Sequence, residues 1–450
     1  MQHAERRSVQ AGSEVGLSVA SVLACPLRGN VNRACPNIRV RLYAGSMTSF
    51  PTVYTLPPDK LLKAQALSHA RTLAHFGGTA WTLLVLWLLV QSGLGARIAG
   101  WAARCTPRKW LQGLLVAPPW LLLLTAIDLP ASLYLHHQYR LYGISVESWQ
   151  LWLSDFAKSV VLTLLFGSIA FGVLYALLRK SPRRWWLWFW ILAIPCEVAA
   201  VFIVPIVIDP LFDHFSPLAQ RDPALVQSLE RVVQRGGLAI PPSRMFVMDA
   251  SRKVAAPNAY VTGFGASKRI VVWDTSLTME SSDEILAMYA HEQGHYVLHH
   301  IYLGMLYSFV VMLVFFWIAA RLLVWAVACR GQRWRIPSLD DWSSLGLLLL
   351  AMSLLGFVAD PVANVFSRWE EHAADVYGQE ALHGIVANPQ ALCAGNFQHL
   401  GELWLEDPAP NALVEWWTSS HPSIAERVRF AAQYDPWGPG KRPRYFPPAP

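Results

Sequence analysis

The sequence predicts a mainly α-helical protein, a multi-span transmembrane helical bundle that carries a small β-hairpin insertion. The chain of 450 residues is 54% hydrophobic and only 15% charged, whereas soluble domains are about 25% charged. Its mean hydropathy is +0.31. Apolar residues gather in runs of about 20, the length with which an α-helix crosses a bilayer. One interval between these runs reads instead as short strands, which predicts the insertion.

Six apolar runs are long enough to span the membrane. They cover residues 76–94, 111–135, 160–178, 185–208, 301–329 and 344–365. The first four form an N-terminal membrane region, residues 47–208, and the last two fall in residues 301–365. Residues 1–46 lack periodicity, and we expect them to be a disordered arm or an extension ahead of a true start at Met47.

Two extramembrane regions remain. The insertion, residues 209–300, is expected to hold a helix and then three strands, the last two joined into a hairpin by residues 265–267. The helix is expected at residues 223–234, and the strands at residues 245–249, 258–264 and 269–274. Residues 366–434 are expected to hold a further helix and an extramembrane C-terminal part. The tail, residues 435–450, is Pro-rich and basic and is expected to lack fixed structure.

Four ionisable residues lie within or at the edges of the apolar runs: Asp128, Glu197, Arg321 and Asp360. Ionisable groups at membrane depth are costly and usually face a polar cavity. A bundle that encloses a water-filled chamber would accommodate them. For Arg321 and Asp360 we favour a position near the interface, and for Asp128 and Glu197 both positions stay open.

Composition also narrows the class of partner. The net charge of +7 fits contact with anionic headgroups of a lipid bilayer. No basic and aromatic module of a nucleic-acid-binding protein is visible, so no nucleic-acid partner is expected. The six Cys are scattered without a CxxC pair, which favours neither a disulfide framework nor a Cys zinc site.

The most informative motif is HExxH at residues 291–295. In a helix, the spacing puts His291 and His295 one turn apart on one face, where both imidazoles can bind one zinc ion. Glu292 can then take a proton from a zinc-bound water. Ser281 and Glu284 form a capping-box pattern that predicts the start of this helix. Gly294 is a small residue that would face a crowded site.

A catalytic zinc site needs a third protein ligand and an open position for water. The candidate segment is residues 367–375, in which Glu371 and Asp375 share a helix face. This spacing suits a carboxylate ligand backed by a second carboxylate. His372 is an alternative ligand, and Glu370 points about 100° away on the same helix. For His299 and His300, one turn beyond the HExxH motif, packing or a supporting hydrogen bond is favoured over ligation.

The expected hairpin lies just before the motif helix. A strand edge beside a zinc ion can hold an extended peptide by β-augmentation. Asn258, Ala259 and Tyr260 are the expected substrate-binding edge. A purely structural hairpin is the alternative.

Taken together, residues 50–432 resemble the type 1 CAAX prenyl proteases, which are integral-membrane zinc endopeptidases. The matching segments are residues 139–145, 152–158, 209–218, 258–264 and 268–275, then HExxH, Glu371 with Asp375, and His421-Pro422 with Arg427. Such an ordered set is far more specific than HExxH alone.

The resemblance implies one zinc ion held by His291, His295 and Glu371, a gluzincin-type site with Glu292 as the general base. It also implies that His421 and Arg427 line the site and assist the oxyanion or the substrate C-terminus. Family members enclose a large chamber within a ring of helices, with zinc at one end. The substrate would be a protein or peptide, lipidated or membrane-embedded.

Two features depart from the family. Its eukaryotic members have seven spans, whereas this chain has six, without the leading helix. The chain is bacterial in style, which indicates an inner-membrane location and leaves prenyl specificity open. Charge counting over the short loops puts the zinc site outside the cytoplasm, while the resemblance implies the cytoplasmic side.

The sequence therefore predicts metal-assisted peptide hydrolysis. An intramembrane-cleaving metalloprotease is less favoured, because no LDG motif occurs near the last span and the motif helix starts with polar residues. A non-catalytic membrane chaperone or scaffold with structural zinc is also less favoured, because such sites usually have four protein ligands that include Cys.

Overall fold

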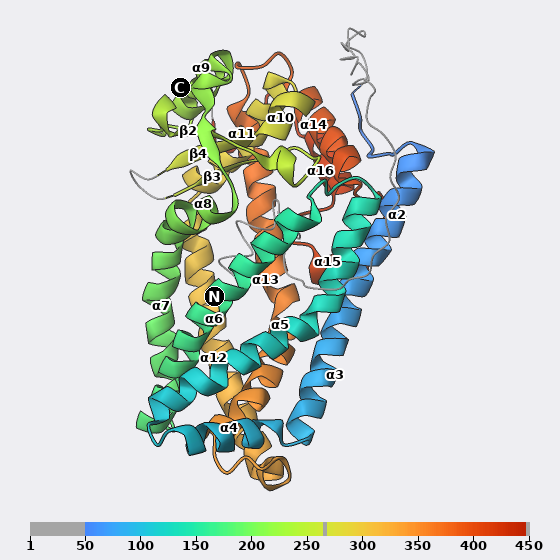
Figure 1. The fold of residues 1–450 in the computed structure, drawn as a ribbon. Helices are drawn as coiled ribbons and strands as arrows, with labels where there is room; N and C mark the ends of the chain where they lie inside the picture. The colour runs from blue at the N-terminus through green and yellow to red at the C-terminus, as the bar shows by residue number, and fades with distance from the viewer. Residues whose placement is uncertain (1–49, 264–267, 447–450) are drawn as a thin grey trace.

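The computed structural model describes residues 50–263 and 268–446. Figure 1 shows long helices standing side by side below a cap that holds the sheet and several short helices. In the described residues, six helical segments are long and apolar enough to cross a membrane, as the sequence predicts. They are Pro58–Gln91, Lys109–Leu141, Trp149–Lys180, Trp185–Phe212, His300–Trp334 and Trp342–Ala381.

Several of these helices are longer than expected. The first comprises α2 (Pro58–Thr72), a π turn (Leu73–Gly77) and α3 (Gly78–Gln91). It ends three residues before the expected residue 94 because Gly93 has a left-handed backbone (φ 68°), and α4 (Leu94–Cys105) begins there. Glycine adopts this conformation without a steric penalty.

The next three membrane helices are continuous or nearly so. They are α5 (Lys109–Leu141), α6 (Trp149–Lys180) and α7 (Trp185–Ile203), the last extended by a π turn (Val204–Ile208) and α8 (Asp209–Phe212). Three prolines lie inside α5 without ending it, since neighbouring helices can satisfy the backbone groups that a proline frees.

The last two spans connect directly to the cap. Helix α12 (His300–Trp334) follows the motif helix directly, and α13 (Leu345–Ala381) is one uninterrupted helix. The boundary expected at residues 365/366 therefore falls inside α13. This helix carries both its membrane-spanning part and the candidate ligand Glu371.

A four-stranded sheet forms the insertion, in the order β1-β2-β4-β3. The three expected strands are β2 (Met245–Met248), β3 (Ala259–Thr262) and β4 (Arg269–Trp273). β3 and β4 pair antiparallel, as a hairpin requires, although the expected turn at residues 265–267 lies outside the described residues. β1 (Phe215–Pro217), which the sequence did not signal, pairs antiparallel with β2, and β2 pairs parallel with β4.

Short helices pack around the sheet and share one buried apolar core. They are α9 (Pro223–Arg235), α10 (Asp274–Met279), α11 (Ser282–Val297), α14 (Pro389–Trp404) and α16 (Ile424–Gln433). Helix α15 (Ala412–Thr418) contributes no residue to this core. Trp417 of α15 reaches the bundle, where its ring lies 4.7 Å from that of Phe357 in α13.

The C-terminal tail differs from the expectation. Residues 435–446 pack on the cap instead of lacking fixed structure. Backbone N–H groups of Arg444 and Tyr445 donate to the fully buried Glu380 carboxylate at 2.7 and 2.6 Å, and the Tyr377 ring lies 5.1 Å from that of Phe446. These contacts are invisible in a local pattern. The predictions for residues 1–46 and 447–450 lie outside the described residues.

The ionisable residues of the spans have distinct surroundings. Asp128 Oδ1 accepts a hydrogen bond from Thr82 Oγ1 at 2.6 Å, and Glu197 Oε2 accepts from Ser308 Oγ at 3.1 Å. Arg321 is exposed, and its expected interfacial position stays a prediction. Asp360 is only 9% exposed, so its side chain is covered by protein, and its depth in the bilayer stays a prediction. The chamber expected within the bundle stays a prediction.

Candidate metal centre

The motif helix α11 begins where the sequence indicates. Ser281 Oγ accepts from Glu284 N, and Ser281 N donates to Glu284 Oε2 at 2.8 Å, which completes the predicted capping box. The helix ends before His299, which has a left-handed backbone (φ 60°) and redirects the chain into α12. The HExxH turn is therefore fixed between a capped start and a sharp turn.

Two glycines let α11 and α13 cross closely. A Cβ atom on Gly294 of α11 would lie 3.1 Å from Ala374 Cα, and one on Gly378 of α13 would lie 2.9 Å from His291 N. Either would push the helices apart. Gly294 therefore does face a crowded site, and the close crossing brings Glu371 to the two histidines.

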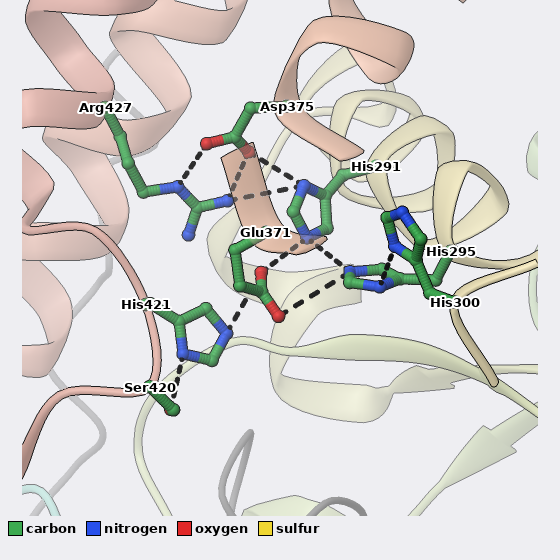
Figure 2. A network of polar contacts seen from close by, with 8 residues as sticks. All are labelled: His291, His295, His300, Glu371, Asp375, Ser420, His421 and Arg427. Atoms are coloured by element: carbon green, nitrogen blue, oxygen red, sulfur yellow. Dashed lines mark hydrogen bonds and ion pairs between the residues drawn. The ribbon is translucent and has the colours of Figure 1, made fainter. Parts of the chain in front are cut away.

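Three candidate ligand atoms converge at this crossing (Figure 2). His291 Nε2 lies 3.1 Å from Glu371 Oε2 and 3.2 Å from His295 Nε2. His295 Nε2 lies 3.6 Å from Glu371 Oε1. Tetrahedral ligands about 2.0–2.1 Å from a zinc ion lie about 3.3 Å from each other. The set His291, His295 and Glu371 thus fits a single metal ion.

The geometry of α13 favours one of the three neighbouring candidate ligands. Glu371 is 8% exposed and faces the two imidazoles. His372 is exposed and turns its ring to Phe430, 4.7 Å away. Glu370 is buried but does not belong to the cluster of ligand atoms.

Asp375 and Arg427 orient the first imidazole. Asp375 Oδ1 lies 2.8 Å from His291 Nδ1, and the Arg427 guanidinium bridges both Asp375 oxygens at 2.6 and 3.0 Å (Figure 2). The carboxylate holds the Nδ1 proton, so the Nε2 lone pair of His291 faces the metal position. Against the effect of burial, Asp375 and Glu371 raise the pKa of His291 to about 10. The two carboxylates therefore favour positive charge at this position, either as a proton on Nε2 or as a metal ion that takes its place.

His300 contacts the second imidazole, that of His295, as Asp375 contacts the imidazole of His291. Its Nδ1 lies 3.1 Å from His295 Nδ1, and the side chain is 3% exposed. The sequence favoured packing or a supporting hydrogen bond for His300, which is confirmed, but did not identify its partner. The left-handed turn at His299 aims His300 back at the site, and only the histidine pair itself hinted at this.

His421 reaches the site from the loop before α16. Its Nε2 lies 3.3 Å from Glu371 Oε2, and Ser420 Oγ lies 2.9 Å from its Nδ1. With Ser420 donating to Nδ1, the Nε2–H faces the metal position. Burial lowers the pKa of His421 below its ordinary value although Glu371 opposes this. A neutral His421 can therefore donate a hydrogen bond at neutral pH.

Glu292 sits beside His291 on α11 and is half-buried. Burial raises the pKa of the Glu292 carboxyl above its ordinary value, while the nearby imidazoles oppose the rise. A carboxyl with a raised pKa is suited to accept and return a proton near neutral pH.

β3 is an edge strand beside α11. Trp273 N donates to Asn258 O, so the backbone groups of Asn258 and Tyr260 point to β4 while those of Ala259 and Val261 point to the free edge. Ala259 N donates to Asn258 Oδ1 at 2.8 Å. Gly263, just past this strand, accepts from Tyr296 Oη of α11, which ties the edge to the motif helix.

Comparisons with known proteins identify the families that this chain resembles. The model of peptidase family M48 matches residues 219–435, and the model described as CAAX prenyl protease N-terminal, five membrane helices, matches residues 42–214. The chain is 32% identical over 377 residues to the uncharacterized metalloprotease YhfN of Bacillus subtilis, across 84% of this chain and 86% of that protein.

Two yeast proteins are also similar. CAAX prenyl protease 1 of Saccharomyces cerevisiae is 35% identical over 179 residues, 39% of each chain. The crystal structure of S. mikatae Ste24p has the same fold, with a TM-score of 0.70 at 24% identity, and the match covers 84% of this chain and 89% of that one.

Proposed function

The chain belongs to peptidase family M48 and is an integral-membrane metalloendopeptidase, and from this premise we propose how its own residues perform hydrolysis. The observation that carries the proposal is the convergence of His291, His295 and Glu371, with ligand atoms 3.1–3.6 Å apart. We propose that these three residues hold one zinc ion. A bound zinc ion supplies Lewis acidity, which acidifies water and polarises a carbonyl.

Glu292 is the proposed general base. It takes the proton of the attacking water and later gives it to the leaving amine, so one carboxyl serves both steps. Its raised pKa supports the return of the proton. Asp375, Arg427 and His300 act through the imidazoles that they orient and touch no substrate in this proposal.

His421 is the proposed oxyanion donor. Its Nε2–H faces the same space as the ligand atoms, and a preorganised donor at the developing charge is worth about 3 kcal/mol in related chemistry. Ser420 supports this role because its hydroxyl can donate to Nδ1, which leaves the proton of a neutral His421 on Nε2.

The edge of β3 is the proposed substrate cradle. Backbone groups of Ala259 and Val261 can pair with an extended peptide, and Asn258 and Tyr260 border it. The helix that carries HExxH, α11, has 16 residues and is not among the six span-length helices of the described residues. This arrangement favours cleavage of a segment presented at the membrane surface over cleavage inside a span.

The substrate class follows from the relatives and the bundle. The name of the yeast relative, CAAX prenyl protease 1, states its substrate class. We propose that this chain cleaves membrane-associated or CAAX-like proteins or peptides. The test below measures whether the substrate must be lipidated. We also propose a location in the cytoplasmic (inner) membrane of a bacterium, and the similarity to a relative from Bacillus subtilis supports the bacterial part of this proposal.

The test compares wild type with Glu292→Gln, and with Glu402→Gln as a matched control in a surface ion pair with Lys60. Each purified protein is assayed for zinc and for cleavage of a prenylated CAAX peptide and its unprenylated twin. We expect one zinc ion in all three and loss of cleavage by a factor of about 10³ or more in Glu292→Gln alone. Retained cleavage by that variant would refute the assignment of Glu292, and the ratio between the two peptides measures the role of the lipid.

A further inference from the structure

The end of the bundle remote from the metal centre contains a cavity between α3 and α12. Its volume is about 470 Å³, and its walls include Trp87 and Gln91 of α3 and Trp325, Arg330, Arg333 and Trp334 of α12. None of these residues takes part in the proposed hydrolysis.

One polar side chain of the cavity, Gln91, holds two of its tryptophans in place. With its amide oxygen turned to the two indoles, Gln91 accepts hydrogen bonds from Trp87 Nε1 and Trp334 Nε1, both at 3.2 Å. One amide thereby fixes two aromatic walls, one from each helix. Trp side chains of this kind favour the level of the lipid headgroups.

Two arginines also line this cavity. Arg330 and Arg333 are exposed, and among residues 50–263 and 268–446 neither lies within ion-pair distance of a carboxylate. A guanidinium presents a planar fork that binds phosphate oxygens in pairs. The cavity therefore offers cationic donors that the protein itself leaves uncompensated.

The level of the cavity matches a membrane interface. Arg330 follows His300 by 30 residues in one helix, a rise of about 45 Å, whereas the hydrocarbon core is about 30 Å thick. Because His300 contacts the metal ligand His295, the cavity lies at the opposite surface of the bilayer. Exposed apolar side chains lead from it along both helices, Leu84 and Leu88 on α3 and Trp317 and Val324 on α12.

Charge at this end also favours an anion. The loops and helix ends at residues 92–109, 179–184 and 330–341 hold eleven Lys and Arg but two carboxylates, Asp340 and Asp341. Basic pockets between membrane helices are a recurrent way to bind anionic headgroups.

We propose that this cavity binds the phosphate of an anionic glycerophospholipid, whose acyl chains lie along the exposed apolar faces of α3 and α12. The competing explanation is that Arg330 and Arg333 only compensate the C-terminal dipole of α12. That role would affect stability but would not distinguish one lipid headgroup from another.

The test measures retention of phosphatidylglycerol and phosphatidylcholine by the purified full chain in neutral detergent, using native mass spectrometry. The variant is Arg330→Gln/Arg333→Gln. The matched control is Arg183→Gln/Arg184→Gln, which removes the same charge from two exposed arginines at the same end, outside the cavity. We expect phosphatidylglycerol affinity to fall about tenfold or more in the cavity variant, by less than about twofold in the control, and phosphatidylcholine affinity to change in neither.

Further arms separate the remaining explanations. Arg330→Lys/Arg333→Lys keeps the charge at the helix end but loses the fork, so an intermediate loss is expected even if the Gln variant fails to fold. Glycerol 3-phosphate should bind far more weakly than the lipid, and equal affinity would overturn the role of the acyl chains. An equal loss in cavity variant and control, or a lower melting temperature without any headgroup-selective loss, would overturn the site.

Discussion

The metal centre holds a buried carboxylate, Asp375, and the membrane bundle holds two partly buried ones, Asp128 and Glu197, but the partners differ. In the metal centre, Asp375 lies between the Arg427 guanidinium and the His291 imidazole. In the bundle, Asp128 accepts from the Thr82 hydroxyl, and Glu197 accepts from the Ser308 hydroxyl. Cationic partners keep a carboxylate charged, whereas a hydroxyl also suits a carboxyl that takes up a proton.

This difference in partners indicates which of the two regions needs a charged carboxylate. A metal site requires negative charge to hold the cation and to orient its ligands. In a membrane span a charged group has a high free-energy cost, whereas a neutral polar group is tolerated when its hydrogen bonds are satisfied. Matched substitutions in the two regions therefore separate the need for charge from the need for a hydrogen bond.

The largest contrast is expected between Asp375→Asn and Asp128→Asn. In Asp375→Asn we expect kcat/KM to fall about 100-fold or more and zinc affinity to fall 10- to 100-fold, because His291 loses its anionic partner. Asp128→Asn should change both by less than about threefold. Zinc titration against a chelator and peptide cleavage check this, and equal losses in the two variants would break the comparison.

A second matched pair tests stability. Glu380 receives backbone donors from Arg444 and Tyr445 and the Tyr434 hydroxyl, so Glu380→Gln should lower the free energy of unfolding by about 2–3 kcal/mol. Glu197→Gln in the bundle should cost about 1 kcal/mol or less. Thermal unfolding in detergent provides the measurement. A bundle variant as unstable as the cap variant would contradict the contrast.

Glu280 provides a test in which the stability of the fold depends on pH. Both of its carboxylate oxygens are buried without a hydrogen-bond partner among the described residues, and burial together with the nearby Glu284 raises its pKa to about 8. The folded state then holds a proton that the unfolded state has already lost. Stability should therefore fall as pH rises from about 4.5 to about 8.

Glu280→Gln should remove this dependence. We expect a gain of roughly 2 kcal/mol at pH 8, less than the full shift implies because water reaches part of the residue. Unfolding measured from pH 5 to pH 8 gives the slope, and a wild-type stability that rises over this range would show that Glu280 is charged in the folded protein.

The smallest expected effect concerns His300. His300→Leu removes the partner of His295 Nδ1, so zinc affinity should fall about tenfold while Glu292 and the ligands stay in place. His299→Asn is the matched control, because Asn tolerates the left-handed backbone of His299. An unchanged zinc affinity in His300→Leu would reduce His300 to a packing residue.

Much of this site could be predicted from local patterns. The HExxH spacing, the capping box at Ser281 and the strand-like runs of β3 and β4 each report on residues within one turn or one strand. The apolar runs likewise predicted six spans, because bilayer thickness sets their length. Their ends were less certain: α13 continues through the expected boundary at residues 365/366, since a helix need not stop where its apolar run stops.

The third ligand required more than a local pattern. Glu370, Glu371 and His372 are all possible ligands in the sequence, and the resemblance to a known family favoured Glu371. In the structure, the choice follows from the rotation of α13 against α11, which Gly294 and Gly378 allow.

By itself, the sequence predicted that this protein lies in a bilayer and that the HExxH helix is its reactive element. Each prediction rests on the spacing of residues within short segments of the chain. Only the tertiary structure decided that His300 lies against His295, that Asp360 is buried and that residues 435–446 pack on Glu380. It also placed Gln91, which joins two tryptophans, in one cavity with two arginines that form no ion pair with a carboxylate among the described residues. Each of these contacts joins different helices or loops, and which side chains meet there depends on how whole helices pack.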